Sequence, residues 1–579
     1  MPLEEEMVAR AGTGELVDGG GGLFSLAEMQ AWGEERTVRA AVLTHLLVAA
    51  QWPVDGKGVR LRAVRVSGFL DLEAAAVRCP LSLDRCYLDT DESVRLDHAT
   101  ASLVIMTRCQ LPGVTGYMLT ARQVDLSGSA LAGSLWLVSA KITDRLICKG
   151  TQLTGTDGGG NALAADAIKV GGGVFLDEGF TAAGAIRLPA AEITGRLSCR
   201  GARLAGADSD GDALYASKMK ASGGVYLYDG FTAAGAIQLP SAEITGQLSC
   251  RGAQLTGTHS DIALNAEGMK VGGNVFLDGG FTAARIVSLA AAHVEGSVSL
   301  MPAALAGEGR VALMAPRAQI SDELRWAPAR QVVGQVNLEG ATVGQLADDW
   351  SGERPNGYWP DGGRLRLDGF TYGRFSGKHQ ATVEQRLAWI RGQYQQPAGL
   401  SPAGFATQPY EQLAAVYQQA GQDTQARKVA IARRADLRKY GNLSPYRWFG
   451  NWLLDKTIKY GYQTWRAGVG LAAVFVAVWV LSVLAQQNHL MAPTGNVGGL
   501  HPAPSATRCT SSYPCFYPAG YAIDTVIPII NVHQAQYWGP DGHAPWGEAW
   551  VAGTWIATGL GWALATLLVA GYTGLVRQD

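Results

Sequence analysis

The residues of this chain best suited to redox chemistry are its eight cysteines, which are too few for a disulfide scaffold in 579 residues. Cys509 and Cys515 lie close together in the sequence and would close a small disulfide loop in an oxidising compartment. The other six cysteines lie in regions expected to face a reducing compartment and should act as small hydrophobic core residues. This pair is therefore the only visible redox candidate, although a structural bridge explains it adequately. The sequence therefore predicts a possible disulfide here, with a redox pair as the alternative.

Glycine-rich motifs do not add a second kind of chemistry. Gly468-Val-Gly470 begins a run that approaches a dinucleotide-binding fingerprint, but it lies in an apolar stretch with no preceding strand, so its amides cannot face a pyrophosphate. The sequence has no P-loop, no His-Glu-x-x-His zinc motif, no Gly-x-Ser-x-Gly elbow and no Cys/His pairs at metal spacing. We therefore expect no catalytic residues, no cofactor and no metal ion.

Carboxylates recur in the middle of the chain. Glu192 and Glu243 are 51 residues apart and, with nearby aspartates, would form an acidic stripe that is either a solvated face or a docking surface. Over 151–302 the acids exceed the bases by only about four, far from the one charge per roughly 1.7 Å of duplex DNA, so DNA mimicry is disfavoured. The formal net charge of −2 also argues against a nucleic-acid partner.

The overall composition indicates which class of protein this chain belongs to. Only 17% of the residues are charged and 74 of the 579 are glycine, whereas soluble globular proteins have about 25% charged residues and about 7% glycine. Few charges and abundant Gly and Ala are typical of membrane proteins and of repeat proteins. The chain has features of both.

From Val59 onward, apolar residues occur in pairs with one residue between them, as in Leu81/Leu83 and Leu135/Leu137. This alternation predicts short strands with one buried face. The strands are brief and regularly spaced, so we expect a mainly β fold, a right-handed parallel β-solenoid over 59–375.

A longer repeat lies within the predicted solenoid, at about 151–302. The octapeptide 192–199 returns at 243–250, and in weaker form at 293–300, which gives a period of about 51 residues. In stacked coils, residues at this period would form inward-facing ladders of identical side chains. The two predicted ladders are Cys148, Cys199 and Cys250, and Phe180, Phe231 and Phe281.

The regions that flank the solenoid look helical. Residues 1–58 are expected to form an N-terminal helical cap, with helical spacing of apolar residues over 23–50 and a capping box at Ser25-Leu-Ala-Glu28. The region 376–465 is expected to be cytoplasmic, helical and basic. Within it, 409–426 resembles one tetratricopeptide-like hairpin, and a plain helical linker explains it equally well.

Two uncharged runs, 467–485 and 551–576, are long enough to span a membrane and define a two-span membrane domain at 466–579. Many basic residues precede the first run, whereas Arg508 is the only lysine or arginine in the loop 486–550. Since positive charge favours the cytoplasmic side of a membrane, both ends of the domain should be cytoplasmic and the loop extracytoplasmic. This predicts a multi-pass protein of the plasma membrane. The basic residues expected to attract anionic headgroups of the lipid bilayer are Arg433, Arg434, Arg438, Lys439, Arg447, Lys456, Lys459 and Arg466.

The second apolar run carries small residues on one face, which would allow close helix packing. Packing against the first run and homo-oligomerisation are both consistent with this pattern. The predicted face consists of Ala549, Gly553, Ala557, Gly561 and Ala565. The apolar segment 521–533 before it is too short to span and is expected to be interfacial or re-entrant.

The repeat Ala-Glu-Ile-Thr-Gly-Arg-Leu-Ser-Cys-Arg-Gly-Ala and the tail from Tyr521-Ala-Ile-Asp524 to Arg577 resemble a group of bacterial, especially actinobacterial, membrane proteins. These proteins carry pentapeptide-like β-solenoid repeats and are often labelled membrane-associated oxidoreductases. The resemblance covers nearly the whole chain and implies a right-handed β-helix at a membrane. It brings no catalytic residues that map onto this sequence.

These features lead to one leading hypothesis of function and two alternatives. The leading one is a membrane-anchored scaffold or sensor whose solenoid binds a cytoplasmic protein partner. The alternatives are an oligomerising effector that permeabilises the membrane, and the oxidoreductase implied by the resemblance.

Overall fold

The computed structural model describes residues 2–22, 24–307, 310–350, 357–395, 404–457, 459–494, 505–507, 513–527 and 529–573. The chain forms two compact units, Met1–Ala420 and Gly421–Asp579. The division falls within the predicted helical region 376–465, which therefore belongs partly to each unit.

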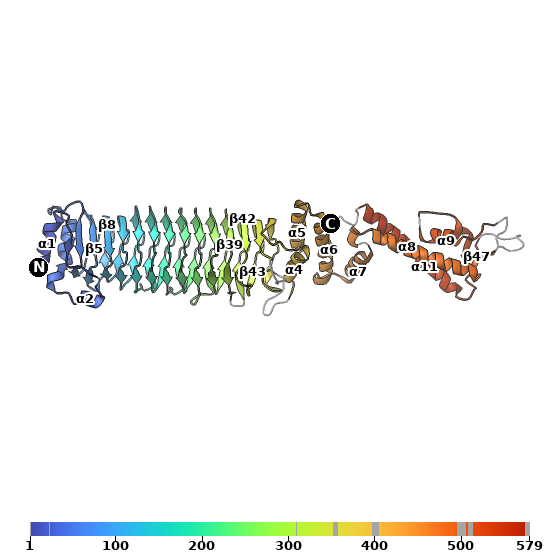
Figure 1. Cartoon of the computed structure of the whole chain (residues 1–579), viewed down its shortest axis with the longest axis horizontal. Coiled ribbons are helices and arrows are strands. Elements are labelled where there is room, and N and C mark those ends of the chain that lie inside the picture. Colours follow the sequence, from blue (N-terminus) through green and yellow to red (C-terminus); the bar gives the residue numbers. More distant parts are fainter. Residues whose placement is uncertain are drawn as a thin grey trace. The chain divides into compact units, whose positions relative to one another are not determined.

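The first unit is built around a β-solenoid of about 13 turns, which confirms that the short alternating strands form a β-solenoid (Figure 1). Within the described residues, its parallel strands form one sheet of 22 strands, sheet A, and two sheets of 12 strands, sheets B and C. Each turn of the central part contributes one strand to sheet C, two to sheet A and one to sheet B. The strands of two successive turns are β17 (Asn161–Ala164), β18 (Lys169–Val170), β19 (Val174–Phe175), β20 (Thr181–Ala182), β21 (Ala185–Arg187), β22 (Glu192–Ile193), β23 (Leu197–Ser198) and β24 (Arg203–Leu204).

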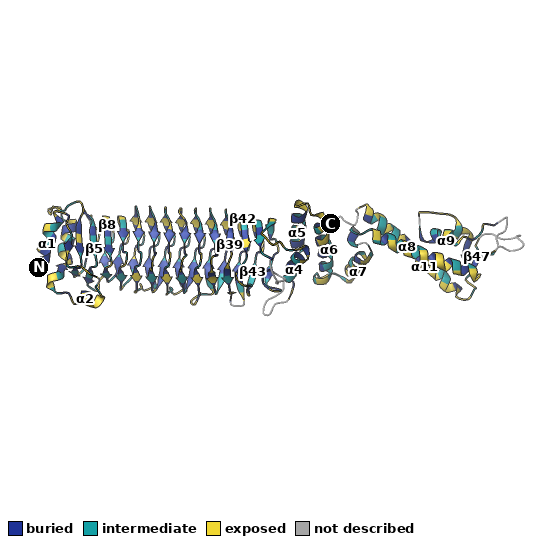
Figure 2. Cartoon of the chain, in the orientation of Figure 1, coloured by how far each residue is buried: buried dark blue, intermediate teal, exposed yellow. Residues whose placement is uncertain are grey.

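Alternation of side chains explains why such short strands are stable. In β18 the side chain of Lys169 is exposed while Val170 is fully buried, and Val174 of β19 is buried as well. The backbone groups of one turn bond to the next, as when the Cys148 amide donates to the Phe175 carbonyl at 2.8 Å. Each turn thus buries its apolar face only by stacking on its neighbours, and the interior is continuously buried (Figure 2).

The 51-residue period corresponds to two turns. Val170 pairs with Ile193, and Ile193 pairs with Ala221, so successive turns take 23 and 28 residues. The longer turns carry an extra loop between sheets B and C, such as 205–211. Gly211 closes this loop with φ +85°, and a Cβ here would lie 2.1 Å from the carbonyl oxygen of His259 in the corresponding loop of the next repeat.

The N-terminal region is only partly as predicted. Its helices are α1 (Pro2–Ala11), α2 (Leu26–Gln30), the short 3₁₀ helix η1 (Glu34–Arg36) and α3 (Ala40–Val48), and the Ser25 capping box is confirmed. The expected helix over 23–50 is wrong between α2 and α3, where β2 (Thr37–Arg39) pairs with β4 (Arg65–Ser67). The free edge of sheet B offers unpaired backbone groups with which 37–39 can form hydrogen bonds, and Val38 becomes fully buried there. These two gains outweigh the helix propensity of this segment.

At the other end of the solenoid, β44 (Thr342–Asp348) and β46 (Thr371–Ser376) are the last strands of sheet A. Helices α4 (Val383–Gly392) and α5 (Gln408–Gln419) follow. The Gln412 side chain of α5 donates to the Tyr372 carbonyl of β46 at 2.7 Å, and Trp389 of α4 packs edge-on against the Tyr372 ring. Both helices therefore contact the last turn.

The second unit is helical and contains two helices long and apolar enough to cross a membrane, α8 (Trp465–Gln487) and α11 (Gly547–Tyr572). Only 11% and 17% of their most apolar stretches are buried within the protein, unlike core helices of a soluble domain. The other elements are α6 (Asp423–Tyr440), α7 (Pro445–Thr457), η3 (Lys459–Gly461), β47 (Met491–Pro493), α9 (Pro518–Val526), α10 (Gln534–Tyr537) and β48 (Trp538–Pro540).

Candidate functional site

The outer face of sheet A carries a column of alternating charge. The register places Lys169, Glu192, Lys220, Glu243 and Lys270 on successive turns. The Lys169–Glu192 and Lys270–Glu243 ion pairs measure 2.9 and 3.4 Å. The predicted acidic stripe is therefore wrong, because two turns fit in each period and a lysine lies between the two glutamates.

Beside the charged column, sheet A carries a second column in which aromatic residues alternate with serines. Successive turns place Phe175, Ser198, Tyr226, Ser249 and Phe276 in register. The three rings are partly exposed, whereas the serines are buried between them. Since parallel strands are spaced by about 4.8 Å, the rings recur about every 9.6 Å.

Local contacts hold these rings on the surface. The Arg196 guanidinium lies 5.2 Å from the Phe175 ring centre, and Arg251 lies 3.9 Å from the Phe276 ring centre. A Cβ on Gly173 would lie 2.9 Å from the Phe175 ring, so this glycine leaves room for it. This column was not among the predicted sites, although Val-Phe-Leu and Val-Tyr-Leu recur in the sequence at the repeat period.

Inside the solenoid, the predicted ladders are buried but alternate with other residues. The interior register reads Cys148, Leu176, Cys199, Leu227 and Cys250 along neighbouring turns, as shown by the Cys199 amide donating to Tyr226 and the Leu176 amide to Ser198. The predicted direct stacking of identical side chains is therefore wrong. The reason is the same as for the predicted acidic stripe, because each 51-residue period spans two turns.

The phenylalanine ladder alternates in the same way. Phe180, Ala202, Phe231, Ala253 and Phe281 follow one another on neighbouring turns, as the amide-to-carbonyl bonds from Arg203 to Phe180 and from Gln254 to Phe231 demonstrate. All three rings are fully buried. Large and small side chains therefore interdigitate along this corner of the core.

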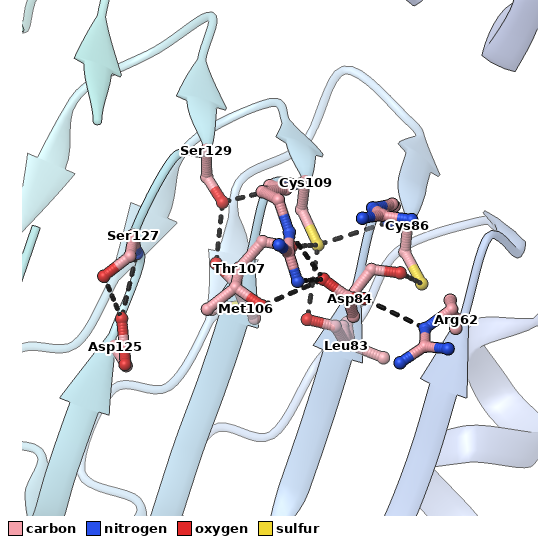
Figure 3. A network of polar contacts seen from close by, with 12 residues as sticks. Arg62, Leu83, Asp84, Cys86, Met106, Thr107, Cys109, Asp125, Ser127 and Ser129 are labelled. Atoms are coloured by element: carbon pink, nitrogen blue, oxygen red, sulfur yellow. Dashed lines mark hydrogen bonds and ion pairs between the residues drawn. The ribbon is translucent and has the colours of Figure 1, made fainter. Parts of the chain in front are cut away.

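The N-terminal turns contain a polar network centred on Asp84 (Figure 3). Its carboxylate accepts hydrogen bonds from Arg62 Nε at 3.1 Å, from Arg108 Nη2 at 2.6 Å and from the Thr107 hydroxyl at 3.3 Å. Burial alone would raise the pKa of Asp84, but the two guanidiniums outweigh it and lower the pKa. The network ties three successive turns together.

A row of buried donors at a neighbouring corner satisfies carbonyls of the preceding turn. The Ser129 hydroxyl donates to the Met106 carbonyl at 2.7 Å, and the Cys109 thiol donates to the Leu83 carbonyl at 3.5 Å (Figure 3). Burial raises the pKa of the Cys109 thiol, so it stays protonated and able to donate. Six cysteines of the described residues are free and buried: Cys79, Cys86, Cys109, Cys148, Cys199 and Cys250.

The end of the solenoid next to α4 is closed around a buried ion pair. Arg386 of α4 donates two hydrogen bonds to the Asp348 carboxylate, at 2.6 and 2.7 Å, and both side chains are 1% exposed. The indole N–H groups of Trp350 and Trp359 donate to the same carboxylate at 2.9 Å. No sequence pattern predicted this pair, because its members are 38 residues apart.

In the second unit, two residues of the small-residue face of α11, Ala557 and Gly561, pack against neighbouring helices. A Cβ at Gly561 would lie 2.1 Å from the Val526 carbonyl oxygen, and Ala557 packs in a cluster with Val526 of α9 and Val478 of α8. Ala549 and Gly553 are exposed, and nothing lies within 4 Å of a Cβ at Gly553.

The far end of the same face borders an apolar groove of about 390 Å³. Ala565 lines it together with Ile529, Trp562 and Val569. The segment 521–533, expected to be interfacial or re-entrant, includes most of α9, which packs against both α8 and α11.

The predicted membrane-surface basic residues lie on several elements. Arg433, Arg434, Arg438 and Lys439 belong to α6, and Arg447 and Lys456 to α7. Lys459 lies in η3 and Arg466 in the first turn of α8. Arg438 and Lys459 both bind Asp455, at 3.1 and 2.8 Å, so two of the eight help to hold α7 in place.

The remaining predicted site is the cysteine pair. Cys515 is disulfide-bonded, whereas Cys509 lies outside the described residues, so their pairing stays a prediction. Over the described ranges, no three His, Cys, Asp or Glu side chains are placed to hold a metal ion. Comparison with protein families, with curated proteins and with solved structures found no match to this chain.

Proposed function

We propose that this protein is a membrane-anchored scaffold or sensor whose β-solenoid binds a protein partner along sheet A. The observation that carries the proposal is the pair of columns on that sheet, one of alternating charge and one of aromatic rings recurring every second turn. Such a surface combines aromatic anchors with a polar surround, as in many protein interfaces. A partner with its own repeated contacts, or an extended segment, would match its spacing.

The membrane anchor of the proposal is the pair α8 and α11. The positive-inside rule supports a cytoplasmic location for the solenoid, because Arg427–Arg466 is rich in basic residues and the loop 486–550 is not. The winding of the solenoid is taken as right-handed, the usual hand of parallel strands joined by crossovers.

The test compares the full chain with two sets of surface variants. The column variant carries Phe175→Ser, Tyr226→Ser and Phe276→Ser, and the control carries Trp136→Ser and Tyr215→Ser on sheet C. After cross-linking in native membranes, we expect partners recovered with the wild type to be retained by the control and lost with the column variant. Equal recovery by both variants would contradict a docking role for sheet A.

A second candidate is an oligomerising effector that permeabilises the membrane. It is favoured by the exposure of Ala549 and Gly553, since small residues on a spanning helix allow another helix to approach closely. Leakage from liposomes that contain the full chain would support it, whereas a pure anchor leaves the vesicles sealed.

The proposal also holds that this protein is not an enzyme. The oxidoreductase suggested by the sequence resemblance predicts flavin or nicotinamide absorbance in the purified protein. A spectrum that shows such a cofactor would replace the scaffold with an enzyme.

A further inference from the structure

Helix α7 (Pro445–Thr457) exposes an unusual number of aromatic side chains. Tyr446 is 71% exposed and Phe449 57%, while Trp448, Trp452 and Leu453 are 45%, 37% and 40% exposed. At 100° per residue, these five side chains occupy one broad face of the helix. In a soluble domain such a face would be turned inward.

One flank of α7, beside the aromatic face, is polar and contacts neighbouring elements of the second unit. Asp455 is 6% exposed, and its carboxylate binds Arg438 of α6 at 3.1 Å and Lys459 of η3 at 2.8 Å. The Asn451 side chain accepts a hydrogen bond from the hydroxyl of Tyr460, a fully buried residue, at 2.7 Å. These contacts fix the rotation of the helix, so the aromatic face is directed outward by specific bonds.

The surroundings of α7 indicate what covers that face. The candidate span α8 begins eight residues after α7 ends and contacts it, and Trp465 at its start is 64% exposed. Lys456 is exposed within the aromatic face of α7, and Arg447 is exposed on the opposite side of the helix. Tryptophan and tyrosine favour the membrane–water interface, and lysine and arginine beside them favour anionic headgroups.

We propose that α7 lies in the plane of the membrane surface, with its aromatic face immersed in the lipid and its Asp455 face bound to α6 and η3. This inference rests on the proposed membrane anchoring by α8 and α11. It assigns the aromatic face to a lipid bilayer that contains anionic lipids. A second copy of the chain or a protein partner would be a different occupant.

The experiment uses the full chain reconstituted in vesicles of phosphatidylcholine and phosphatidylglycerol. Single variants Phe449→Cys and Leu453→Cys are labelled with an environment-sensitive fluorophore, since the six free cysteines of the described chain are buried. Fluorescence is quenched either by nitroxide-labelled phospholipids or by aqueous iodide. Val480→Cys, on the exposed surface of α8, is the membrane control, and Thr424→Cys, exposed at the far end of α6, is the aqueous control.

We expect lipid quenching at Phe449 and Leu453 and at least about threefold weaker iodide quenching than at Thr424. If Val480 is quenched by lipid but Phe449 and Leu453 are quenched by iodide, the inference about α7 is wrong and the anchor stands. If the probe at Val480 is not quenched by the nitroxide-labelled lipids, the proposed membrane anchoring is wrong, and the inference about α7 is then wrong as well. Probes on α7 shielded from both quenchers would show that protein covers this face and would overturn the proposal.

Discussion

Individual residues set the pH dependence of the solenoid. Asp212 begins the sheet C strand β25 (Asp212–Tyr215) after an extra loop, is 6% exposed and accepts a hydrogen bond from Gln238 at 2.9 Å. Burial raises the pKa of Asp212 to about 6, and the nearby Asp208 and Asp210 add to this effect. The equivalent residues of the neighbouring repeats are Asn161 and Ile262, neither of which carries a charge.

We expect Asp212→Asn to stabilise the solenoid at neutral pH by roughly 1–2 kcal/mol. Because the folded pKa lies above the unfolded value, the wild type loses stability as the pH rises from about 4 through about 6, and the variant does not. Thermal unfolding midpoints measured between pH 4 and pH 8 check this. Parallel curves for wild type and variant would contradict it.

The Arg386–Asp348 pair illustrates how a buried charge depends on its partner. Arg386→Met leaves the Asp348 carboxylate buried without a cation and should destabilise the first unit by roughly 3–5 kcal/mol. Adding Asp348→Asn should recover part of that loss, since the uncompensated charge is then gone. Denaturant unfolding of the two single variants and the double variant measures the coupling, and purely additive losses would exclude it.

At the scale of elements, helix packing depends on where a backbone approaches closely. Of the two glycines on the small-residue face of α11, Gly561 faces the end of α9 and Gly553 faces open space. The sequence pattern could not distinguish these roles, because both residues share one helical face.

Gly561→Ala should therefore displace α9 and destabilise the second unit by roughly 1–3 kcal/mol, whereas Gly553→Ala should stay within about 0.5 kcal/mol of the wild type. Melting of the purified full chain in detergent measures both. A larger loss for Gly553→Ala than for Gly561→Ala would mean that α9 does not pack on this face, and loss of a dimer in that variant would instead favour oligomerisation.

At the scale of the whole molecule, the pairing of turns constrains which deletions the solenoid tolerates. Deletion of 200–250 removes two turns and joins Cys199 to Arg251, so the sequence Cys-Arg-Gly-Ala and all columns stay in register. Deletion of 200–227 removes one turn and places Phe180 against Phe231 and Glu192 against Glu243.

We expect the two-turn deletion to melt within a few degrees of the wild type. The one-turn deletion should melt at a clearly lower temperature, because facing rings overpack the core and adjacent carboxylates repel. Circular dichroism melting of both full-length variants decides between them. Equal midpoints would mean that alternation between turns contributes little to stability.

Much of the architecture was predictable because its signals are local. Alternating residues such as Val59 and Leu61 predicted strands, the 51-residue identity predicted stacked repeats, and the uncharged runs at 467–485 and 551–576 predicted the two apolar helices. The Ser25 capping box likewise depends on residues within one helical turn.

The tertiary structure alone decided which residues meet. The number of turns per period depends on loop lengths such as 205–211, and it determined that Lys220 lies between Glu192 and Glu243. The outward rotation of α7 and the buried Asp348–Arg386 pair arise from contacts between separate elements. The physical reason is that periodicity records which face of an element is apolar, whereas register, rotation and ion pairing are determined only when distant segments pack together.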